Sequence, residues 1–300
     1  MVRHQRLVKP ENPGLVHLTV LRREQLSPHW MRVTLGGGEI DRFAPMGYDQ
    51  WFRLFLPLGG TEGLDRLPAR ANQLIGYLRY LRIPDGVRPV MRNYTVRAFR
   101  PASTTSGAEL DVDLVLHGSP ADGSAGPASR WAQTCAVGES VVVIDEGLGF
   151  NPAAGTERVL LVGDETALPA VAGICASLPA SATGLAIVEV PTAEDALEFT
   201  RPDGVAVRWV VREDPGAAGP TQPVPGTLAL AELRTLTDAE VDAGEVHAFV
   251  AGEQALATGG RRHLVNERGV AKERVSFTGY WRLGAASPTP KAQVAAPAAG

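Results

Sequence analysis

The stretch "RVLLVGDETALPA", residues 158–170, decides the fold because it joins a continuous apolar strand to a helical pattern through a glycine turn. The same alternation continues to the end of the chain. Further buried-type strands and helices are "GLAIVEV" (184–190), "VAVRWVV" (205–211), "TLALAELRTL" (227–236), "VHAFVAG" (246–252), "EQALATGGRRHLVNERG" (253–269) and "RVSFTGY" (274–280). Strands alternating with helices predict an open, mainly parallel sheet covered by helices on both faces, as in a Rossmann-like fold.

The sequence before this stretch has a different character, with short strand patterns separated by glycine and proline. These are "LVHLTVLRREQL" (15–26), "WMRVTLGG" (30–37), "QWFRLFLPL" (50–58), "RNYTVRAFR" (92–100), "ELDVDLVLHG" (109–118) and "ESVVVIDEG" (139–147). Such a series predicts an antiparallel Greek-key β-barrel. We therefore expect a barrel domain over residues 1–154, an α/β domain over 155–284, and a low-complexity, disordered tail over 285–300.

Composition excludes several classes of function. The 300 residues carry a formal charge of −4 and no basic run, which disfavours nucleic-acid binding. No signal peptide or long apolar segment is evident, so we expect a soluble, cytoplasmic protein without stable membrane association. The two cysteines and six scattered histidines show no ligand spacing, so no metal site is predicted. Without a hydrophobic stripe, a monomer is the default expectation.

Two motifs in the barrel segment suggest a dinucleotide ligand. In "RNYTVR" (92–97), an extended strand points Arg92 and Tyr94 to one face, where a guanidinium suits a phosphate and a ring suits a flat heterocycle. In "GPASRWA" (126–132), a helix start offers backbone N–H groups to a diphosphate. Solvated surface arginines and an ordinary serine-capped helix are the alternatives. The two motifs together favour FAD.

The array "RNYTVR", "DVDLVLHG", "GPASRWA", "LVGDETALPA" and "GYWRLG" resembles the siderophore-interacting protein family. Its members are FAD-dependent ferric-siderophore reductases of the ferredoxin–NADP reductase superfamily. The resemblance implies that hydride from NADPH or NADH reaches the flavin, which passes single electrons to siderophore-bound Fe(III) and so releases Fe(II). A ferric siderophore would be the substrate, and ferredoxin remains an alternative electron donor. No catalytic acid, base or nucleophile is obligatory.

The resemblance also implies roles for individual residues. Tyr94, Thr95 and Trp281 would lie near the isoalloxazine, and Thr166 would face the zone where flavin and nicotinamide meet. The FAD-binding residues implied in the barrel are Arg92, Tyr94, Thr95, Val96, Arg97, His117, Gly118, Gly126, Pro127, Ala128 and Ser129. The cofactor-binding residues implied in the α/β segment are Asp164, Glu165, Thr166, Ala167, Gly252, Glu253, Tyr280, Trp281 and Arg282.

Three features depart from a simple reading of these motifs. Asp164 and Glu165 place acid where a phosphate cradle tolerates it poorly, and the Gly259-Gly260 pair predicts a kinked or loose helix. The corner "IDEGLGF" (144–150) is acidic where the family is commonly basic. If Asp145 and Glu146 line the substrate mouth, preference for an anionic ferric complex is in doubt. A flavin reductase with another acceptor, and a non-catalytic siderophore-binding protein, therefore remain as alternatives.

Overall fold

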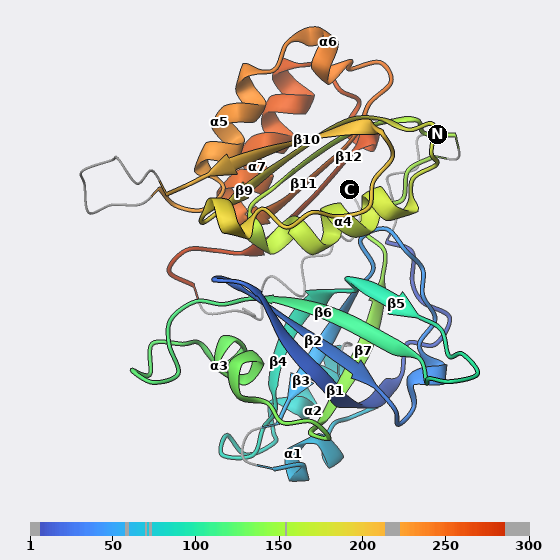
Figure 1. Ribbon diagram of the computed structural model, residues 1–300, viewed down its shortest axis with the longest axis vertical. Helices are drawn as coiled ribbons and strands as arrows, with labels where there is room; N and C mark the ends of the chain where they lie inside the picture. The colour runs from blue at the N-terminus through green and yellow to red at the C-terminus, as the bar shows by residue number, and fades with distance from the viewer. Residues whose placement is uncertain are drawn as a thin grey trace.

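The computed structural model describes residues 7–57, 60–69, 71, 74–153, 155–213 and 223–285 (Figure 1). The tail that the sequence predicts to be disordered lies outside the described residues from position 286 onward. Within the described part of the chain, no helix has both the length and the apolar character required to span a membrane.

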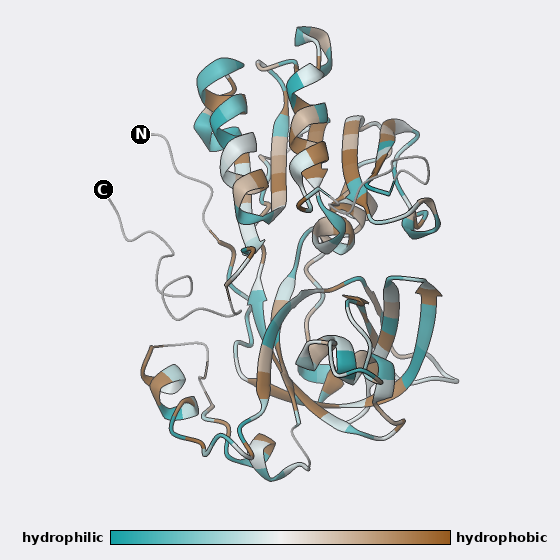
Figure 2. Cartoon of the chain, turned by 90° about the vertical axis from the view of Figure 1, so that its left-hand side faces the viewer, coloured by the Kyte–Doolittle hydropathy of each residue, from teal (hydrophilic) through white to brown (hydrophobic). Residues whose placement is uncertain are grey.

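The first half of the chain forms one curled antiparallel sheet, seen as a ring in Figure 2. Its strands follow the alternating patterns of the sequence. They are β1 (Leu15–Ser27), β2 (Trp30–Gly36), β3 (Trp51–Leu56), β4 (Val90–Thr95), β5 (Ala98–Arg100), β6 (Glu109–Val115) and β7 (Ser140–Gly147). They are hydrogen-bonded in the order β4-β3-β7-β1-β2-β6-β5. The barrel is therefore open, with β4 and β5 as its two edges.

The segment 92–100, predicted as one strand, is in fact two strands on opposite edges of this sheet. β4 pairs with β3, β5 pairs with β6, and Val96 and Arg97 carry the chain between them. The N–H of Val96 donates to the carbonyl of Gln50 at 2.8 Å, and that of Arg97 donates to the carbonyl of Asp111 at 3.0 Å. Strand β4 together with this crossing to β5, residues 90–98, is called the seam below. Pattern alone did not reveal it because the residues remain extended.

Helical segments surround the open barrel. α1 (Glu62–Asp65) and α2 (Leu74–Tyr80) lie in the long connection between β3 and β4. α3 (Pro127–Thr134) packs against β2, β4 and β6, and a short 3₁₀ turn, η1, spans Ile40–Arg42. Trp131 of α3 joins the barrel core. These elements position the start of α3 beside the edge strand β4.

The second half forms a parallel sheet in the order β10-β9-β8-β11-β12. Its strands are β8 (Arg158–Gly163), β9 (Thr183–Val190), β10 (Gly204–Val211), β11 (His247–Glu253) and β12 (Val275–Trp281). Its helices are α4 (Leu168–Ser177), α5 (Thr227–Thr235), α6 (Asp238–Val241) and α7 (Gln254–Arg262), with short helices η2 (Glu165–Ala167), η3 (Ala193–Asp195), η4 (His263–Glu267, a π-helix) and η5 (Lys272–Arg274). The strand order changes direction between β8 and β11, where ligands bind in such sheets. The predicted fold class is confirmed.

The glycine pair in α7 does not break the helix, contrary to the expectation of a kink at that point. α7 continues through Gly259 and Gly260 and changes to the π-helical η4 only at His263. A Cβ at Gly260 would lie 2.8 Å from Val250 of β11, and one at Gly259 would lie 2.8 Å from Leu230 of α5. The pair therefore permits close packing of α7 on both neighbours.

The two sheets are joined by α4 and by a shared core. Trp30 and Phe150 of the first half are buried with the side chains of α4. A Cβ at Gly173 would lie 2.2 Å from the carbonyl oxygen of Tyr48, so only glycine allows this approach. At another contact, buried Asp195 accepts hydrogen bonds from the hydroxyl of Ser27 at 2.6 Å and the backbone N–H of His29 at 3.1 Å. The halves form one packed body.

Substituting Gly173→Ala should lower the free energy of unfolding by about 1–3 kcal/mol, because the added methyl overpacks the contact with Tyr48. In an unobstructed helix the same change stabilises by about 1 kcal/mol. Chemical denaturation measures the difference, and Gly107→Ala, where nothing lies within 4 Å, is the control. A stabilised Gly173→Ala protein would contradict the close packing of α4 on the barrel.

Candidate functional site

The seam of the barrel brings Tyr94 and Thr95 against the end of the parallel sheet. Val96 is buried in the barrel core, and Tyr94 packs half-buried against the same core. Burial raises the pKa of the Tyr94 phenol above its usual value. Burial raises the pKa of the Tyr280 phenol in β12 overall, although the Thr95 side chain lies close enough to that phenol to lower its pKa. The predicted residues Tyr94, Thr95 and Tyr280 are therefore together in space.

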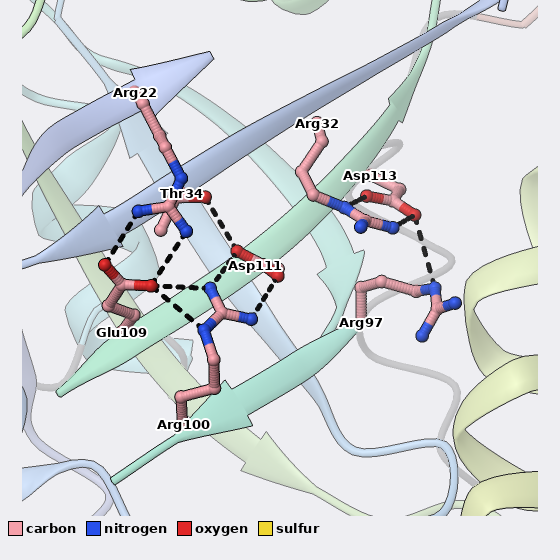
Figure 3. A network of polar contacts seen from close by, with 8 residues as sticks. All are labelled: Arg22, Arg32, Thr34, Arg97, Arg100, Glu109, Asp111 and Asp113. Carbon is pink, nitrogen blue, oxygen red and sulfur yellow. Dashed lines mark hydrogen bonds and ion pairs between the residues drawn. The ribbon is translucent and has the colours of Figure 1, made fainter. Parts of the chain in front are cut away.

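Arg92 is the arginine of the seam region whose charge is not matched by a carboxylate. Its guanidinium donates to the carbonyl of Met91 at 2.8 Å and, among the described residues, forms no ion pair. Figure 3 shows the contrast for Arg97 of the seam and for arginines of the neighbouring strands. Their ion pairs are Arg97–Asp113 at 3.3 Å, Arg32–Asp113 at 2.7 Å, and Arg100 with Asp111 at 2.6 Å and Glu109 at 2.8 Å. Arg92 is therefore the cation available to an anionic ligand.

The side chain of Arg97 has a different environment from that of Arg92. Its side chain lines a cavity of about 230 Å³ between the two halves, with Arg32 and Asp113 on one side and α4 on the other. Burial lowers the pKa of its guanidinium, and Asp113 counters that effect. Arg92 and Arg97 thus lie at separate places. The two guanidinium groups therefore do not converge on one phosphate site.

The start of α3 combines a glycine, a proline and two small residues beside β4. Gly126 is the N-terminal cap and Pro127 the first helical residue, so the next N–H groups have no carbonyl partner in the helix. The Ser129 hydroxyl, however, accepts from the N–H of His117 at 3.1 Å and donates to its carbonyl at 3.0 Å. The Ser129 side chain therefore fixes the loop at His117 and Gly118. The groups of α3 that could bind an anion are the backbone N–H groups of Ala128 and Ser129.

The imidazole of His117 covers Gly126. A Cβ at Gly126 would lie 2.8 Å from Cε1 of His117, and one at Gly118 would lie 2.5 Å from the backbone of Ser124. Gly118 also has a φ of +67°, which favours glycine. Both glycines are thus required by close packing. The predicted residues His117, Gly118 and Gly126–Ser129 therefore lie close together.

Asp164 links the ends of three strands of the parallel sheet. Its fully buried carboxylate accepts from the N–H of Thr166 at 2.9 Å, the N–H of Glu253 at 2.6 Å and the indole of Trp281 at 3.1 Å. The Thr166 hydroxyl donates to it as well, at 2.5 Å. A Cβ at Gly252 would lie 2.5 Å from this carboxyl, and its φ is +129°. Asp164 therefore positions the loops rather than facing a phosphate.

Glu253 and the residues around it complete this junction. The Glu253 carboxylate accepts from the N–H of Ala255 at the start of α7 and from the N–H of Leu283 at 3.2 Å. These bonds hold the chain after β12, where Trp281 is half-buried and Arg282 exposed. Ala167 is fully buried against Gly163 in the turn after β8. Glu253 and Ala167 are thus structural supports of the loop.

The second acid of the loop, Glu165, is neutralised by an arginine distant in sequence. Arg212 donates to both oxygens of Glu165 at 2.6 and 2.7 Å and to Glu189 at 3.0 Å. Burial lowers the pKa of Arg212, but the hydrogen bonds and charge attraction of Glu165 and Glu189 together outweigh burial and raise that pKa. The negative charge of Glu165 is therefore neutralised inside the protein by Arg212. Sequence reasoning missed Arg212, although it follows β10 at the same edge of the sheet.

The acidic corner of the barrel does not line a substrate mouth. Asp145 and Glu146 are each 3% exposed. Glu146 accepts from Arg53 at 2.6 Å and Lys9 at 3.0 Å, and Asp145 accepts from Gln50 at 2.8 Å. The doubt about anionic substrates that rested on this corner is therefore removed, because its carboxylates have partners within the protein.

The residues present fit FAD. An uncompensated guanidinium, a helix start with free N–H groups and a half-buried phenol lie along β4 and α3, which pack together. The Thr95–Tyr280 contact places this surface at the ends of β8, β11 and β12. Among the described residues no group of histidine, cysteine, aspartate or glutamate side chains is arranged to hold a metal ion.

Comparison with known proteins identifies the family of this chain. The family model "Siderophore-interacting FAD-binding domain" matches residues 19–148, and "Siderophore-interacting protein" matches residues 156–284. This chain belongs to the siderophore-interacting protein family. Ferric vibriobactin reductase ViuB of Vibrio cholerae is 30% identical over 89% of this chain and 89% of its own length. An NADPH-dependent ferric-chelate reductase of Escherichia coli is 26% identical, covering 88% of this chain and 91% of that protein.

Solved structures give the same result. A siderophore utilization protein from T. fusca has a TM-score of 0.71 and 29% identity, covering 94% of this chain and 97% of that one. The ferredoxin–NADP⁺ reductase of Plasmodium falciparum has a TM-score of 0.60 with 9% identity, covering 93% and 100%. The second likeness shows the fold alone. This member of the siderophore-interacting protein family thus has the fold of a ferredoxin–NADP⁺ reductase.

Buried carboxyls of the site should make stability depend on pH. Burial, and then Glu165, raise the pKa of Asp164 to about 7, whereas an unfolded aspartate titrates near about 4. The folded protein thus binds a proton that the unfolded chain releases between these values, so this stabilisation is lost as the pH rises from about 4 to about 7. Asp164→Asn should make that fall in the free energy of unfolding shallower.

Urea unfolding at a series of pH values measures this slope. Asp203→Asn, an exposed carboxyl, is the matched control and should keep the slope of the parent protein. An Asp164→Asn protein with an unchanged slope would show that Asp164 does not hold a proton in the folded state.

Proposed function

We propose that this protein is an FAD-dependent ferric-siderophore reductase that takes electrons from NADPH or NADH. The observation that carries the proposal is the seam, where unpaired Arg92 and half-buried Tyr94 lie beside α3, and Thr95 contacts Tyr280 at the end of the parallel sheet. The family match and the reductases among its relatives support it. We also propose that the chain divides near residue 155 into an FAD half and a nicotinamide half.

The residues of the seam would bind and orient the cofactor. Arg92 and the first N–H groups of α3 would neutralise the FAD diphosphate, because guanidinium groups and helix starts both bind such anions. Tyr94 would pack on the isoalloxazine, and Thr95 would donate or accept at its edge. When bound, FAD supplies the conversion of a two-electron hydride into single electrons.

The end of the parallel sheet would receive the nicotinamide nucleotide. Asp164 keeps Trp281 and Thr166 in fixed positions at the switch point between β8 and β11. Trp281 would cover the exposed face of the flavin ring, and Thr166 would face the nicotinamide. Both assignments follow from the contact between Thr95 and Tyr280, which places the β12 end at the seam.

The iron would arrive with its own ligands. A hydroxamate or catecholate siderophore provides hard oxygen donors, which hold Fe(II) far less tightly than Fe(III), so reduction would release the metal. No protein ligand is required for this step. The absence of a membrane-spanning helix from the described residues is compatible with the cytoplasmic location that we propose.

Arg92→Ala should weaken FAD binding by at least tenfold, or about 1.4 kcal/mol, because the diphosphate would lose its unpaired cation. Calorimetric titration of the flavin-free protein with FAD measures the loss. Arg234→Ala removes an equal charge from the exposed surface of α5 and should leave affinity unchanged. Equal FAD affinity in the Arg92→Ala and parent proteins would remove Arg92 from the site.

The reaction itself is tested by anaerobic titration of the FAD-loaded protein with NADPH and then NADH. We expect one nicotinamide to bleach the visible flavin band, and a ferric hydroxamate to restore it while a ferrous chelator develops colour. Bleaching without reoxidation by any ferric siderophore, but with turnover of a quinone, would reassign the protein to a flavin reductase with another acceptor. A flavin that neither nicotinamide bleaches would contradict the proposed donor and direct the search to ferredoxin.

A further inference from the structure

We propose that the cavity between the barrel and α4 is a second small-molecule site, which binds an aryl monocarboxylate through Arg97. The cavity measures about 230 Å³ and is lined by residues of both halves of the protein. It is separate from the proposed flavin site, because neither Tyr94 nor Tyr280 lines it. A ligand bound here would be additional to FAD and to the nicotinamide nucleotide.

Arg97 supplies this cavity with a cation that is only partly neutralised. Both carboxylate oxygens of Asp113 accept hydrogen bonds from Arg32, at 2.7 and 2.8 Å, whereas Nε of Arg97 lies 3.3 Å from the same carboxylate. Figure 3 shows the two terminal nitrogens of Arg97 pointing away from Asp113. Two guanidinium groups thus share one carboxylate, and the terminal N–H groups of Arg97 are the donors that an anionic ligand would meet.

The other carboxylate of the wall, that of Glu198, does not neutralise Arg97. The Glu198 side chain is 76% exposed and is paired with Arg201 at 3.1 Å. Each of the two carboxylates therefore has an arginine of its own, and Arg97 remains the surplus cation. A planar guanidinium binds a carboxylate through two parallel hydrogen bonds, so a carboxylate is the anion that matches these donors best.

The remaining wall of the cavity is apolar. Its residues come from α4, from β1 and from the segment before β10, and they are Leu26, Leu168, Ala172, Leu197 and Phe199. The ring of Phe199 is held edge-on to that of Trp209, with centroids 6.1 Å apart and an interplanar angle of 76°. An inorganic anion would leave these apolar groups uncovered, whereas an aromatic ring would bury its surface against them.

The volume agrees with a single substituted ring. An apolar cavity of about 150 Å³ holds benzene. The larger volume of about 230 Å³ therefore accommodates a ring together with its carboxylate. With the carboxylate on Arg97 and the ring against α4, the ligand would bridge the two halves of the protein. Such a ligand should stabilise the folded state, because it binds only when the two halves are packed together.

Benzoate, benzamide and acetate test this site in calorimetric titrations of the protein with saturating FAD. Benzoate should bind saturably. Benzamide should bind at least tenfold more weakly because it lacks the charge, and acetate at least tenfold more weakly because it lacks the ring. The Kd for benzoate should be the same with and without FAD.

Arg97→Gln should raise the Kd for benzoate at least tenfold, because the ligand would lose its cation. Arg22→Gln is the matched control. It removes an exposed charge from the same barrel at a position that does not line the cavity, and it should leave the Kd unchanged. Thermal melting shows whether both variants are folded. If Arg97→Gln does not fold, the contrast between benzoate and benzamide in the parent protein still decides the role of the charge.

Equal affinities for benzoate and benzamide, an unchanged Kd in a folded Arg97→Gln protein, or no saturable binding of benzoate would overturn the assignment while the proposed function stands. Equal affinities for benzoate and acetate would make the cavity a plain anion site and would overturn the aryl class. Displacement of benzoate by FAD would give the cavity to the cofactor and would overturn it as well. A protein that binds benzoate but no FAD would keep this site and contradict the proposed function.

Discussion

The open seam of the barrel is the constraint on which the rest of the structure depends. A sheet with two free edges has unpaired backbone groups along both, and the chain limits this by passing directly from β4 to β5. Val96 and Arg97 make that crossing with hydrogen bonds to Gln50 and Asp111. The crossing leaves Arg92, Tyr94 and Thr95 on an edge strand that α3 and β12 approach. The flavin site that we propose lies at this open edge of the barrel.

The parallel sheet contributes fixed loops to the same place. Fully buried Asp164 accepts bonds from Thr166, Glu253 and Trp281, so the ends of β8, β11 and β12 move as one unit. Arg212 turns the charge of Glu165 inward. The close approach of Gly173 in α4 to the backbone of Tyr48 and these contacts fix the position of one sheet relative to the other.

The sequence predicted the strands, the helices and the motif residues well, because their signals are local. It did not predict the break of residues 92–100 into two strands, since both sides of the seam remain extended. The partners of Asp145, Glu146, Glu165 and Ser129 were also out of reach, because Gln50, Arg53, Arg212 and His117 are brought to them only by tertiary folding. Helix propensity predicted a kinked or loose helix at Gly259-Gly260, whereas the structure uses the two glycines to pack α7 closely on Val250 and Leu230. Local pattern supplied the candidate site residues but not the contacts that orient them.

The central claim, that the seam is the flavin site, is tested most directly by a crystal structure of the protein with FAD. The account predicts an isoalloxazine against Tyr94, between Thr95 and the Tyr280–Trp281 end of β12, with the diphosphate at Arg92 and the start of α3. Flavin bound elsewhere would contradict it, above all in the cavity of about 230 Å³ lined by Arg97, Arg32 and α4. In that case the seam would serve only to connect the two edge strands of the barrel.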